Sequence, residues 1–276
     1  MPAPPPQPRP HGFHQRYGPW GLVLGASEGI GAAFAHELAR AGLSVVLVAR
    51  SRERLSDLAH AIEAGHGVRA APVPCDLAAE DAAARVAEAA GDREIGLVVY
   101  NAAASAVGRF LDVPPEEHVR SVHVNARGVV TLVHRFALPM ARRGRGGIIV
   151  MSSLTAFQGT PLVATYGATK AFDLTFAEAL HDELGEHGID VLACCAGATS
   201  TPGYRRTAPA GRPGRFSPKL QEAEEVAREA LAALGRGAVA IPGRGNRLAS
   251  FVMRRILPRR MSVAWIGREM RRRYEG

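Results

Sequence analysis

The sequence predicts an α/β domain built on a doubly wound, mainly parallel sheet of seven strands, with helices on both faces. Two observations support this fold. Short apolar runs rich in Val and Ile alternate with longer segments whose apolar residues recur at helical spacing, as in successive βαβ units. Right-handed crossovers between such units place helices on both faces. In addition, no linker or internal repeat divides the 276 residues, so we expect one domain.

The expected strands are short apolar runs. The run at 44–48 (Ser-Val-Val-Leu-Val) is continuous and β-branched, which is typical of a strand buried on both faces. The run at 68–74 is the weakest of the set. In chain order, strands are expected at 22–24, 44–48, 68–74, 97–100, 148–151, 190–195 and 238–241.

Helices are expected between these strands. In the first helix, Ile30, Phe34 and Leu38 recur at steps of four and therefore share one face. Gly188 is the expected C-cap of the fifth helix, and Ser217-Pro218 is a typical N-cap and first-turn pair for the sixth. The full set is expected at 29–41, 52–64, 79–90, 115–143, 165–187 and 217–234.

The two ends of the chain differ in composition from the domain, which we place at 18–245. Residues 1–17 are proline-rich and predict a flexible tail, not a secretory signal, because they hold no apolar stretch. Residues 246–276 predict a basic amphipathic extension, which Pro258 divides into two helices. The extension could lie on an anionic membrane, but its packing against the domain or a partner subunit is the favoured interpretation.

Composition argues against several classes of protein. No run of about 18 apolar residues is present, so no membrane-spanning helix is expected. Three cysteines without C-x-x-C and ten histidines without H-E-x-x-H predict neither a disulfide framework nor a metal site, and the default location is cytoplasmic. The formal net charge is +8, but residues 251–276 carry most of it, so nucleic-acid binding is not expected.

The first strand joins the first helix through a glycine-rich turn, Gly25-Ala-Ser-Glu-Gly-Ile-Gly31. Glycines let the backbone approach a pyrophosphate, and the helix N-terminus favours its negative charge. The sequence therefore predicts a dinucleotide site.

Arg50 and Arg52 follow the second strand, where a carboxylate would bind the ribose of NAD, and no acidic residue precedes Glu53. Pairing of Arg50 with a 2′-phosphate predicts NADP(H); the alternative is a solvated surface pair of arginines.

Tyr166 and Lys170 are four residues apart at the start of an expected helix, so their side chains lie on one face. A phenol is a poor base at neutral pH, but a nearby ammonium favours the phenolate and makes proton transfer accessible. Lys170 and Lys219 are the only lysines in the chain, which makes this spacing less of a coincidence. Taken alone, such a pair is usually part of an ordinary helix surface.

Ser153 follows the expected strand at 148–151, just as Gly25 and Asn101 follow other strands. Ligands of an open parallel sheet bind beyond the carboxyl ends of its strands, so these residues are expected to share one crevice. Ser153 lacks the G-x-S-x-G context of a hydrolase nucleophile.

Together these motifs resemble the short-chain dehydrogenase/reductase family over about residues 18–245, and within it the 3-ketoacyl and hydroxysteroid reductase branch. The matching pieces are Gly25-x-x-x-Gly29-Ile30-Gly31, Cys75-Asp76-Leu77, Tyr100-Asn101-Ala102-Ala103, Asn125, Ser152-Ser153, Tyr166-x-x-x-Lys170 and Ala196-Gly197 with Thr201. The chain departs from the family pattern at Leu24 and Ala196, where Thr and Pro are usual, and at Tyr100 and Ala103, where the segment Asn-Asn-Ala-Gly is usual.

The resemblance implies a Rossmann-type fold and four catalytic residues. Tyr166 would exchange the proton with the substrate oxygen and Ser153 would polarise that oxygen. Lys170 would bind the nicotinamide ribose and tune Tyr166, and Asn125 would hold a proton-relay water. The implied cofactor contacts are Gly25, Ser27, Glu28, Gly29, Ile30, Gly31, Arg50, Arg52, Asp76, Leu77, Asn101, Ala102, Tyr166, Lys170, Gly197, Thr199 and Thr201.

The expected function is NADP(H)-dependent reduction of a carbonyl, or oxidation of an alcohol, on an apolar 3-oxoacyl, steroid-like or natural-product substrate. Residues 198–218, rich in Gly, Pro, Thr and Arg, are the expected lid. Four arginines in it could attract an acidic group, although solvated loop charges are the favoured interpretation; they are Arg205, Arg206, Arg212 and Arg215. Imine reduction, epimerisation and a low-turnover cofactor-binding scaffold remain alternatives. The resemblance also implies a homo-oligomer, a dimer or a tetramer.

Overall fold

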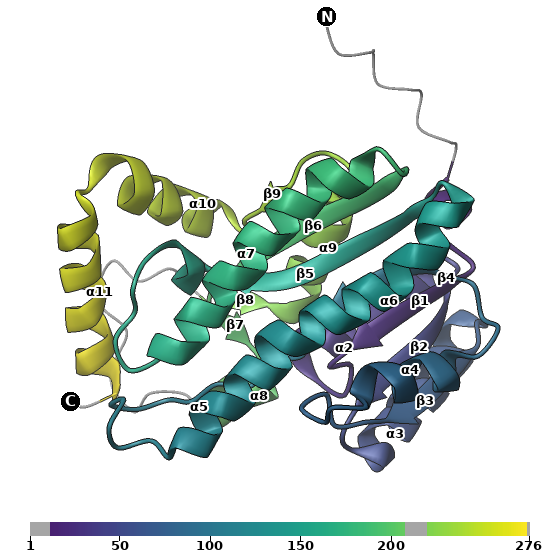
Figure 1. Ribbon diagram of the computed structural model, residues 1–276, viewed down its shortest axis with the longest axis horizontal. Helices are drawn as coiled ribbons and strands as arrows, with labels where there is room; N and C mark the ends of the chain where they lie inside the picture. The colour runs from purple at the N-terminus through teal and green to yellow at the C-terminus, as the bar shows by residue number, and fades with distance from the viewer. Residues whose placement is uncertain (1–11, 208–219, 275–276) are drawn as a thin grey trace, which may run out of the picture.

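The computed structural model describes residues 12–207 and 220–274 of the chain. Its centre is a parallel sheet of seven strands in the order β3-β2-β1-β4-β5-β6-β9 (Figure 1). The strands are β1 Trp20–Leu24, β2 Ser44–Ala49, β3 Ala70–Pro74, β4 Ile95–Tyr100, β5 Gly146–Ser153, β6 Ile189–Ala196 and β9 Val239–Ala240. The predicted doubly wound, seven-stranded sheet is confirmed.

Helices cover both faces of the sheet, as predicted. One face packs against α4, α6 and α7, and the other against α2, α3 and α9. In Figure 1, α6 and α7 cross in front of the sheet while α2 and α9 lie behind it. Their bounds are α2 Gly29–Arg40, α3 Arg52–His66, α4 Ala82–Ala90, α6 Gly128–Arg143, α7 Ala164–Gly185 and α9 Ala223–Ala233. Every residue of β1 and of β4 is buried, because both lie inside the sheet between the two helix layers.

The long helix expected at 115–143 contains a widened turn. It consists of α5 (Pro115–Val122), a π-helical turn at His123–Arg127 and α6, in unbroken succession. The buried Tyr100 hydroxyl donates a hydrogen bond of 2.6 Å to the carbonyl of Val124 in this turn. Such turns hold one extra residue and are frequent at functional sites. Here the turn carries Asn125, which is fully buried.

The prediction of a flexible tail over residues 1–17 is wrong for residues 13–17. Phe13–Tyr17 form helix α1. The Arg16 guanidinium and the Tyr17 hydroxyl each donate a hydrogen bond of 2.5 Å to the carboxylate of Asp190, at the start of β6. Burial, together with Asp190, raises the pKa of Tyr17, so the phenol stays a hydrogen-bond donor. This helix is held by a partner more than 170 residues away in the chain, so local composition gives no sign of it.

Two expected helix ends were also misplaced. Helix α7 ends at Gly185 with Glu186 as its C-cap, so Gly188 is not the cap; it adopts a left-handed conformation in the turn before β6. Helix α9 begins at Ala223, because Gln221–Glu222 (β8) pair instead with Thr199–Ser200 (β7). The expected cap Ser217-Pro218 lies outside the described residues, as does the lid beyond α8 (Pro202–Thr207).

The carboxyl-terminal extension forms α10 (Arg244–Phe251), a π-helical turn (Val252–Ile256) and α11 (Arg259–Tyr274). The predicted division at Pro258 is confirmed. The extension contacts the domain at the short 3-10 helix Leu154–Phe157, where the Arg254 guanidinium lies 4.1 Å from the centre of the Phe157 ring. Figure 1 shows α10 and α11 at one side of the molecule. None of the helices in the described ranges is long and apolar enough to cross a membrane.

Candidate active site

Four of the predicted site residues meet at one edge of the sheet. Gly25, Asn101, Ser153 and Gly197 stand at or directly after the carboxyl ends of β1, β4, β5 and β6. The strand order reverses between β1 and β4, and ligands of doubly wound sheets bind beside such a reversal. These four residues therefore lie at the same edge of the sheet, as expected.

The glycine turn is held too tightly for larger residues. Gly25 has a φ of +84°, and a Cβ at this position would lie 2.6 Å from the Cα of Ala102. A Cβ on Gly31 would lie 2.0 Å from the carbonyl oxygen of Gly25. The Asn101 amide donates a hydrogen bond of 2.9 Å to that same carbonyl. The turn after β4 thus holds the turn after β1 in place, and the Asn101 side chain makes the hydrogen bond that joins them.

The side chain of Glu28 ties the glycine turn to two other segments. Its carboxylate accepts a hydrogen bond of 2.7 Å from Arg54 on α3 and also pairs with Arg206 on α8. Arg206, followed by Arg54, lowers the pKa of Glu28. Next to it, Gly29 lies so close to Thr201 that a Cβ on the glycine would be 2.9 Å from the threonine. The segment after β6 therefore closes one side of the turn, beside the helix start formed by Gly29 and Ile30.

Arg50 and Arg52 lie where the sequence places them, at the end of β2. Both side chains are exposed, with Ser51 between them as the N-cap of α3. Of the remaining residues in the lid, Arg205 is exposed, and Arg212 and Arg215 lie outside the described residues.

Asp76 has a partner that the sequence does not reveal. Its two carboxylate oxygens each accept a hydrogen bond of 3.0 Å from Arg120 on α5, and one also accepts from the Ala78 backbone. Partial burial acts to raise the pKa of Asp76, but the Ala78 amide and Arg120 together hold it below its ordinary value. The next residue, Leu77, has its side chain in the core.

Tyr166 and Lys170 lie together on α7, as the spacing predicts. The Lys170 ammonium is 5.8 Å from the centre of the Tyr166 ring. It donates hydrogen bonds of 2.8 Å to the Met151 carbonyl and to a carboxylate oxygen of Asp173. Lys170 is only 2% exposed, whereas Tyr166 is half-buried.

Asp173 was not singled out in the sequence. It is fully buried, and its second carboxylate oxygen has no hydrogen-bond partner in the part of the chain that the structure describes. Burial raises the pKa of Asp173 to about 6, against the opposing attraction of Lys170. For Lys170, burial acts to lower the pKa, but Asp173 and Tyr166 together raise it above its ordinary value. The available signal was an acidic residue one helical turn after Lys170.

Ser153 and Asn125 complete the predicted catalytic set. Ser153 is half-buried, and its hydroxyl accepts a hydrogen bond of 3.2 Å from the Thr155 amide. Both amide protons of Asn125 are used, one by the Ala104 carbonyl and one by the Thr169 hydroxyl, while its oxygen accepts from the Ala104 amide. The Asn125 side chain therefore has no N–H left for a water and links the loop after β4 to α7.

The segment after β6 is fixed by the carboxyl-terminal extension. A Cβ on Gly197 would lie 2.5 Å from the side-chain amide of Asn246 on α10. The Thr199 hydroxyl donates a hydrogen bond of 3.0 Å to the Gly197 carbonyl. Asn246, which is buried, was missed in the sequence because its role depends on packing between distant segments.

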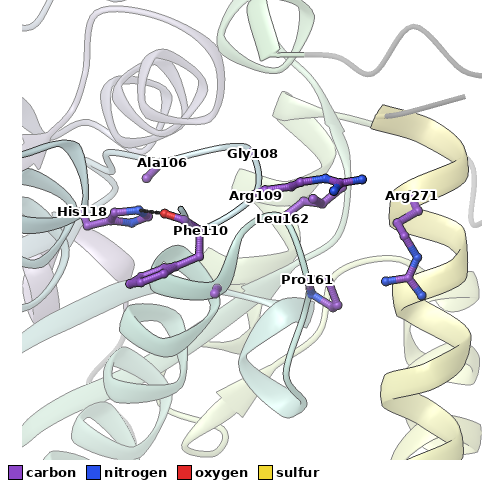
Figure 2. Close-up of a pocket in the computed structure, with 9 residues that line it drawn as sticks. Ala106, Gly108, Arg109, Phe110, His118, Pro161, Leu162 and Arg271 are labelled. Carbon is purple, nitrogen blue, oxygen red and sulfur yellow. Dashed lines mark hydrogen bonds between the residues drawn. The ribbon is translucent and has the colours of Figure 1, made fainter. Parts of the chain in front are cut away.

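A cavity of about 450 Å³ lies between the loop after β4, the start of α7 and α11. Its lining residues are Ala106, Gly108, Arg109, Phe110, His118, Pro161, Leu162, Ala164 and Arg271. Ala164, one of these lining residues, begins α7, the helix that carries Tyr166. Figure 2 shows Phe110 and His118 on one side, with Arg271 on α11 on the other. The wall is mainly apolar, with cationic side chains at the side of the extension.

His118 is fixed between two parts of this cavity wall. One ring nitrogen lies 2.8 Å from the Thr165 hydroxyl and the other 3.3 Å from the Phe110 carbonyl. The Phe110 and His118 rings also lie 4.6 Å apart. His118 therefore joins the loop after β4 to the start of α7, directly before Tyr166.

The residues at this edge fit a dinucleotide. The glycine turn stands at the start of a 12-residue helix, and the N-terminus of that helix favours an anion. Lys170 supplies a buried ammonium, and Arg50 an exposed cation at the end of β2. Within the described residues, no three His, Cys, Asp or Glu side chains gather as a metal site requires.

Comparison with known proteins agrees with this geometry. A family profile described as short chain dehydrogenase matches residues 20–210. The chain is 35% identical over 239 residues to a 7beta-hydroxysteroid dehydrogenase of Clostridium sardiniense, covering 85% of this chain and 89% of that protein.

Solved structures show the same likeness. One, from a study of 7beta-hydroxysteroid dehydrogenase stereoselectivity, has a TM-score of 0.86 at 31% identity and covers 92% of this chain and 99% of that one. A short-chain dehydrogenase from Sphingobium yanoikuyae in complex with NADPH has a TM-score of 0.74 at 33% identity, covering 82% and 88%.

Proposed function

The chain belongs to the short-chain dehydrogenase/reductase family of oxidoreductases, and we propose that it uses NADP(H) to interconvert a ketone and an alcohol on a steroid-like substrate. The observation that supports the proposal is the pairing of Tyr166 with Lys170 on α7, together with Ser153 and the glycine turn at the carboxyl ends of β5 and β1. The bound cofactor would supply or accept the hydride at the substrate carbon. The chain's own residues would handle the oxygen and its proton.

The proton step falls to Tyr166. In reduction, its hydroxyl donates a proton to the oxygen of the carbonyl as the carbon receives hydride; in oxidation, the phenolate takes the proton back. The Lys170 ammonium lies 5.8 Å from the ring, and its positive charge would stabilise the negative charge that develops on the phenol oxygen during the transfer. Ser153, at the end of β5, would donate a hydrogen bond to the same substrate oxygen. The phenol and serine hydroxyls would thus polarise one carbonyl together.

The choice of NADP(H) rests on the end of β2. Arg50 is exposed there, and no carboxylate precedes Glu53 to bind the 2′-hydroxyl of NAD. A guanidinium suits a phosphate group through its parallel N–H donors. The relative from Sphingobium yanoikuyae was solved with NADPH, which supports the same cofactor for this chain.

The substrate class rests on the cavity at the start of α7, the helix that carries Tyr166. Its volume of about 450 Å³ lies within the range of about 300–1,000 Å³ typical of small-molecule sites. Its apolar wall of Phe110, Pro161 and Leu162 suits a rigid hydrocarbon skeleton. The relatives named 7beta-hydroxysteroid dehydrogenase support a steroid-like ketone over the 3-oxoacyl and natural-product alternatives.

A turnover screen tests this proposal. Steroid ketones, 3-oxoacyl thioesters and small ketones are incubated with NADPH or with NADH, and cofactor consumption is followed by absorbance. We expect consumption of NADPH with steroid ketones and little with small ketones, which bury less apolar area. Absence of consumption with every ketone, at a protein concentration where NADPH binding is saturated, would contradict the proposal.

A further inference from the structure

A second ionisable side chain lies directly behind Lys170, and the proposed reaction gives it no role. Asp173 sits one helical turn further along α7, fully buried, with its carboxylate 2.8 Å from the Lys170 ammonium. Its other oxygen is buried without a hydrogen-bond partner among the described residues. The ionisable groups that interact electrostatically with this pair are Tyr166 on α7, Tyr100 on β4 and Cys195 on β6.

Stability does not account for this carboxylate. Removing two charges from water costs several kcal/mol per ion, and only complete hydrogen bonding offsets that cost. Here one carboxylate oxygen stays unsatisfied. Leu174 and Ala177 already supply the apolar contacts of this part of α7 with the sheet. A pair of hydrophobic residues at positions 170 and 173 would pack as well or better, so the buried pair calls for an explanation other than stability.

The first thing that Asp173 does is fix the direction of the Lys170 ammonium. An ammonium has three N–H donors. The Met151 carbonyl on β5 and the Asp173 carboxylate take two of them, each at 2.8 Å. One donor is left for a ligand, and its direction is set by the two fixed acceptors. Because Lys170 is only 2% exposed, its side chain has little room for another arrangement.

The second effect is on the charge that Tyr166 experiences. When Asp173 is ionised, it and Lys170 form a pair with no net charge, and a pair acts on a neighbour far more weakly than a single ammonium does. When Asp173 is protonated, the full charge of Lys170 acts on the phenol. Burial raises the pKa of Asp173 to about 6, so both states occur within the range in which enzymes work.

We propose that Asp173 is a positioning residue that acts on Tyr166 through Lys170, orienting the ammonium and moderating its charge. This inference rests on the proposed function, because it assigns Tyr166 the proton transfer. It predicts that the pH range over which the alcohol is oxidised depends on Asp173, which touches neither substrate nor cofactor.

The test is the Asp173→Asn variant, which keeps the shape of the side chain and removes its charge. The unbalanced ammonium then favours the phenolate, so the midpoint of kcat/KM against pH for alcohol oxidation moves to lower pH by about one unit. Glu178→Gln is the matched control, since it removes one negative charge from an exposed site on the same helix. An unchanged midpoint in Asp173→Asn, or one moved to higher pH, would overturn the proposal.

A second measurement needs neither turnover nor a variant at position 173. The carboxyl carbon of Asp173 and the phenol carbon of Tyr166 are followed by NMR against pH in the otherwise unaltered protein, with Tyr166→Phe used for assignment. We expect the Tyr166 signal to respond as Asp173 titrates near pH 6. A Tyr166 chemical shift that stays constant while Asp173 titrates would refute the inference, even if the enzyme is active. Conversely, failure of the ketone screen with a coupled titration would refute only the proposed function.

Discussion

The Lys170 ammonium lies 5.8 Å from the centre of the Tyr166 ring, one turn along the same helix, while its hydrogen bonds run to Met151 and Asp173. The lysine is therefore close enough to influence the phenol electrostatically but is held by other groups. This arrangement separates two tasks, since the phenol is left accessible for proton transfer and the ammonium is kept charged in a dry environment.

Arg50→Asp should shift cofactor preference from NADPH towards NADH. A charge-assisted hydrogen bond contributes about 1.5–3 kcal/mol, so the KM for NADPH should rise about ten- to a hundredfold while the KM for NADH falls. Arg142→Asp, at an exposed position near the far end of α6, makes the same change in charge away from the site. The same NADPH to NADH ratio in wild type and Arg50→Asp would show that Arg50 is only a surface charge.

Gly31→Ala should weaken cofactor binding at least about tenfold, because its Cβ would lie 2.0 Å from the Gly25 carbonyl oxygen and the turn must open. Gly65→Ala on α3 is the matched control, since no atom lies within 4 Å of its Cβ. That control should keep cofactor affinity and gain up to about 1 kcal/mol of stability. Fluorescence titration with NADPH measures both variants. Equal affinity in the two would argue against the turn as the phosphate site.

Asp173 should make stability depend on pH in a defined direction. Its pKa is raised from 3.8 to about 6 in the folded protein, so the folded state holds this proton more tightly than the unfolded chain does. Its contribution to the free energy of unfolding is therefore full below about pH 4 and is lost as the pH rises through about 6. In urea unfolding, the free energy of unfolding of wild type should fall as the pH rises from about 4 through about 6, and that of Asp173→Asn should fall less. A difference independent of pH would contradict the assignment.

Removal of α11, by ending the chain at Leu257, should open the cavity on the side where Arg271 lies. The KM for the ketone should then rise about tenfold, while the affinity for NADPH stays within about twofold, because the glycine turn precedes α2 and α11 is no part of it. Co-sedimentation of both proteins with anionic vesicles tests the membrane interpretation at the same time. An unchanged KM together with vesicle binding of the full chain alone would favour that interpretation instead.

The fold was predictable from the sequence because its strands are buried on both faces and therefore read as continuous apolar runs, as in β2 and β4. Helix α1 was not, because five residues cannot form a stable helix alone and Asp190 holds them in place. The π-helical turn at His123–Arg127 leaves no local signal either. It depends on the Tyr100 hydroxyl reaching the Val124 carbonyl.

The candidate site was predictable where spacing along one element fixes geometry, as for Tyr166 and Lys170 or for the glycine turn. It was not predictable where side chains from distant segments meet. Arg120 reaches Asp76 from another helix, and Asn246 reaches Gly197 from the extension. Asp173 lies between these cases, because its spacing from Lys170 was visible but its burial depends on the sheet beneath α7.

The most direct test of the whole account is the turnover of Tyr166→Phe on the best ketone of the screen, measured beside its affinity for NADPH. Loss of the phenolic proton should lower kcat at least about a hundredfold, since positioned acid catalysis contributes about 10²- to 10⁴-fold, while NADPH still binds with affinity close to that of wild type. A variant that reduces the ketone at a rate within about threefold of wild type would show that another group moves the proton.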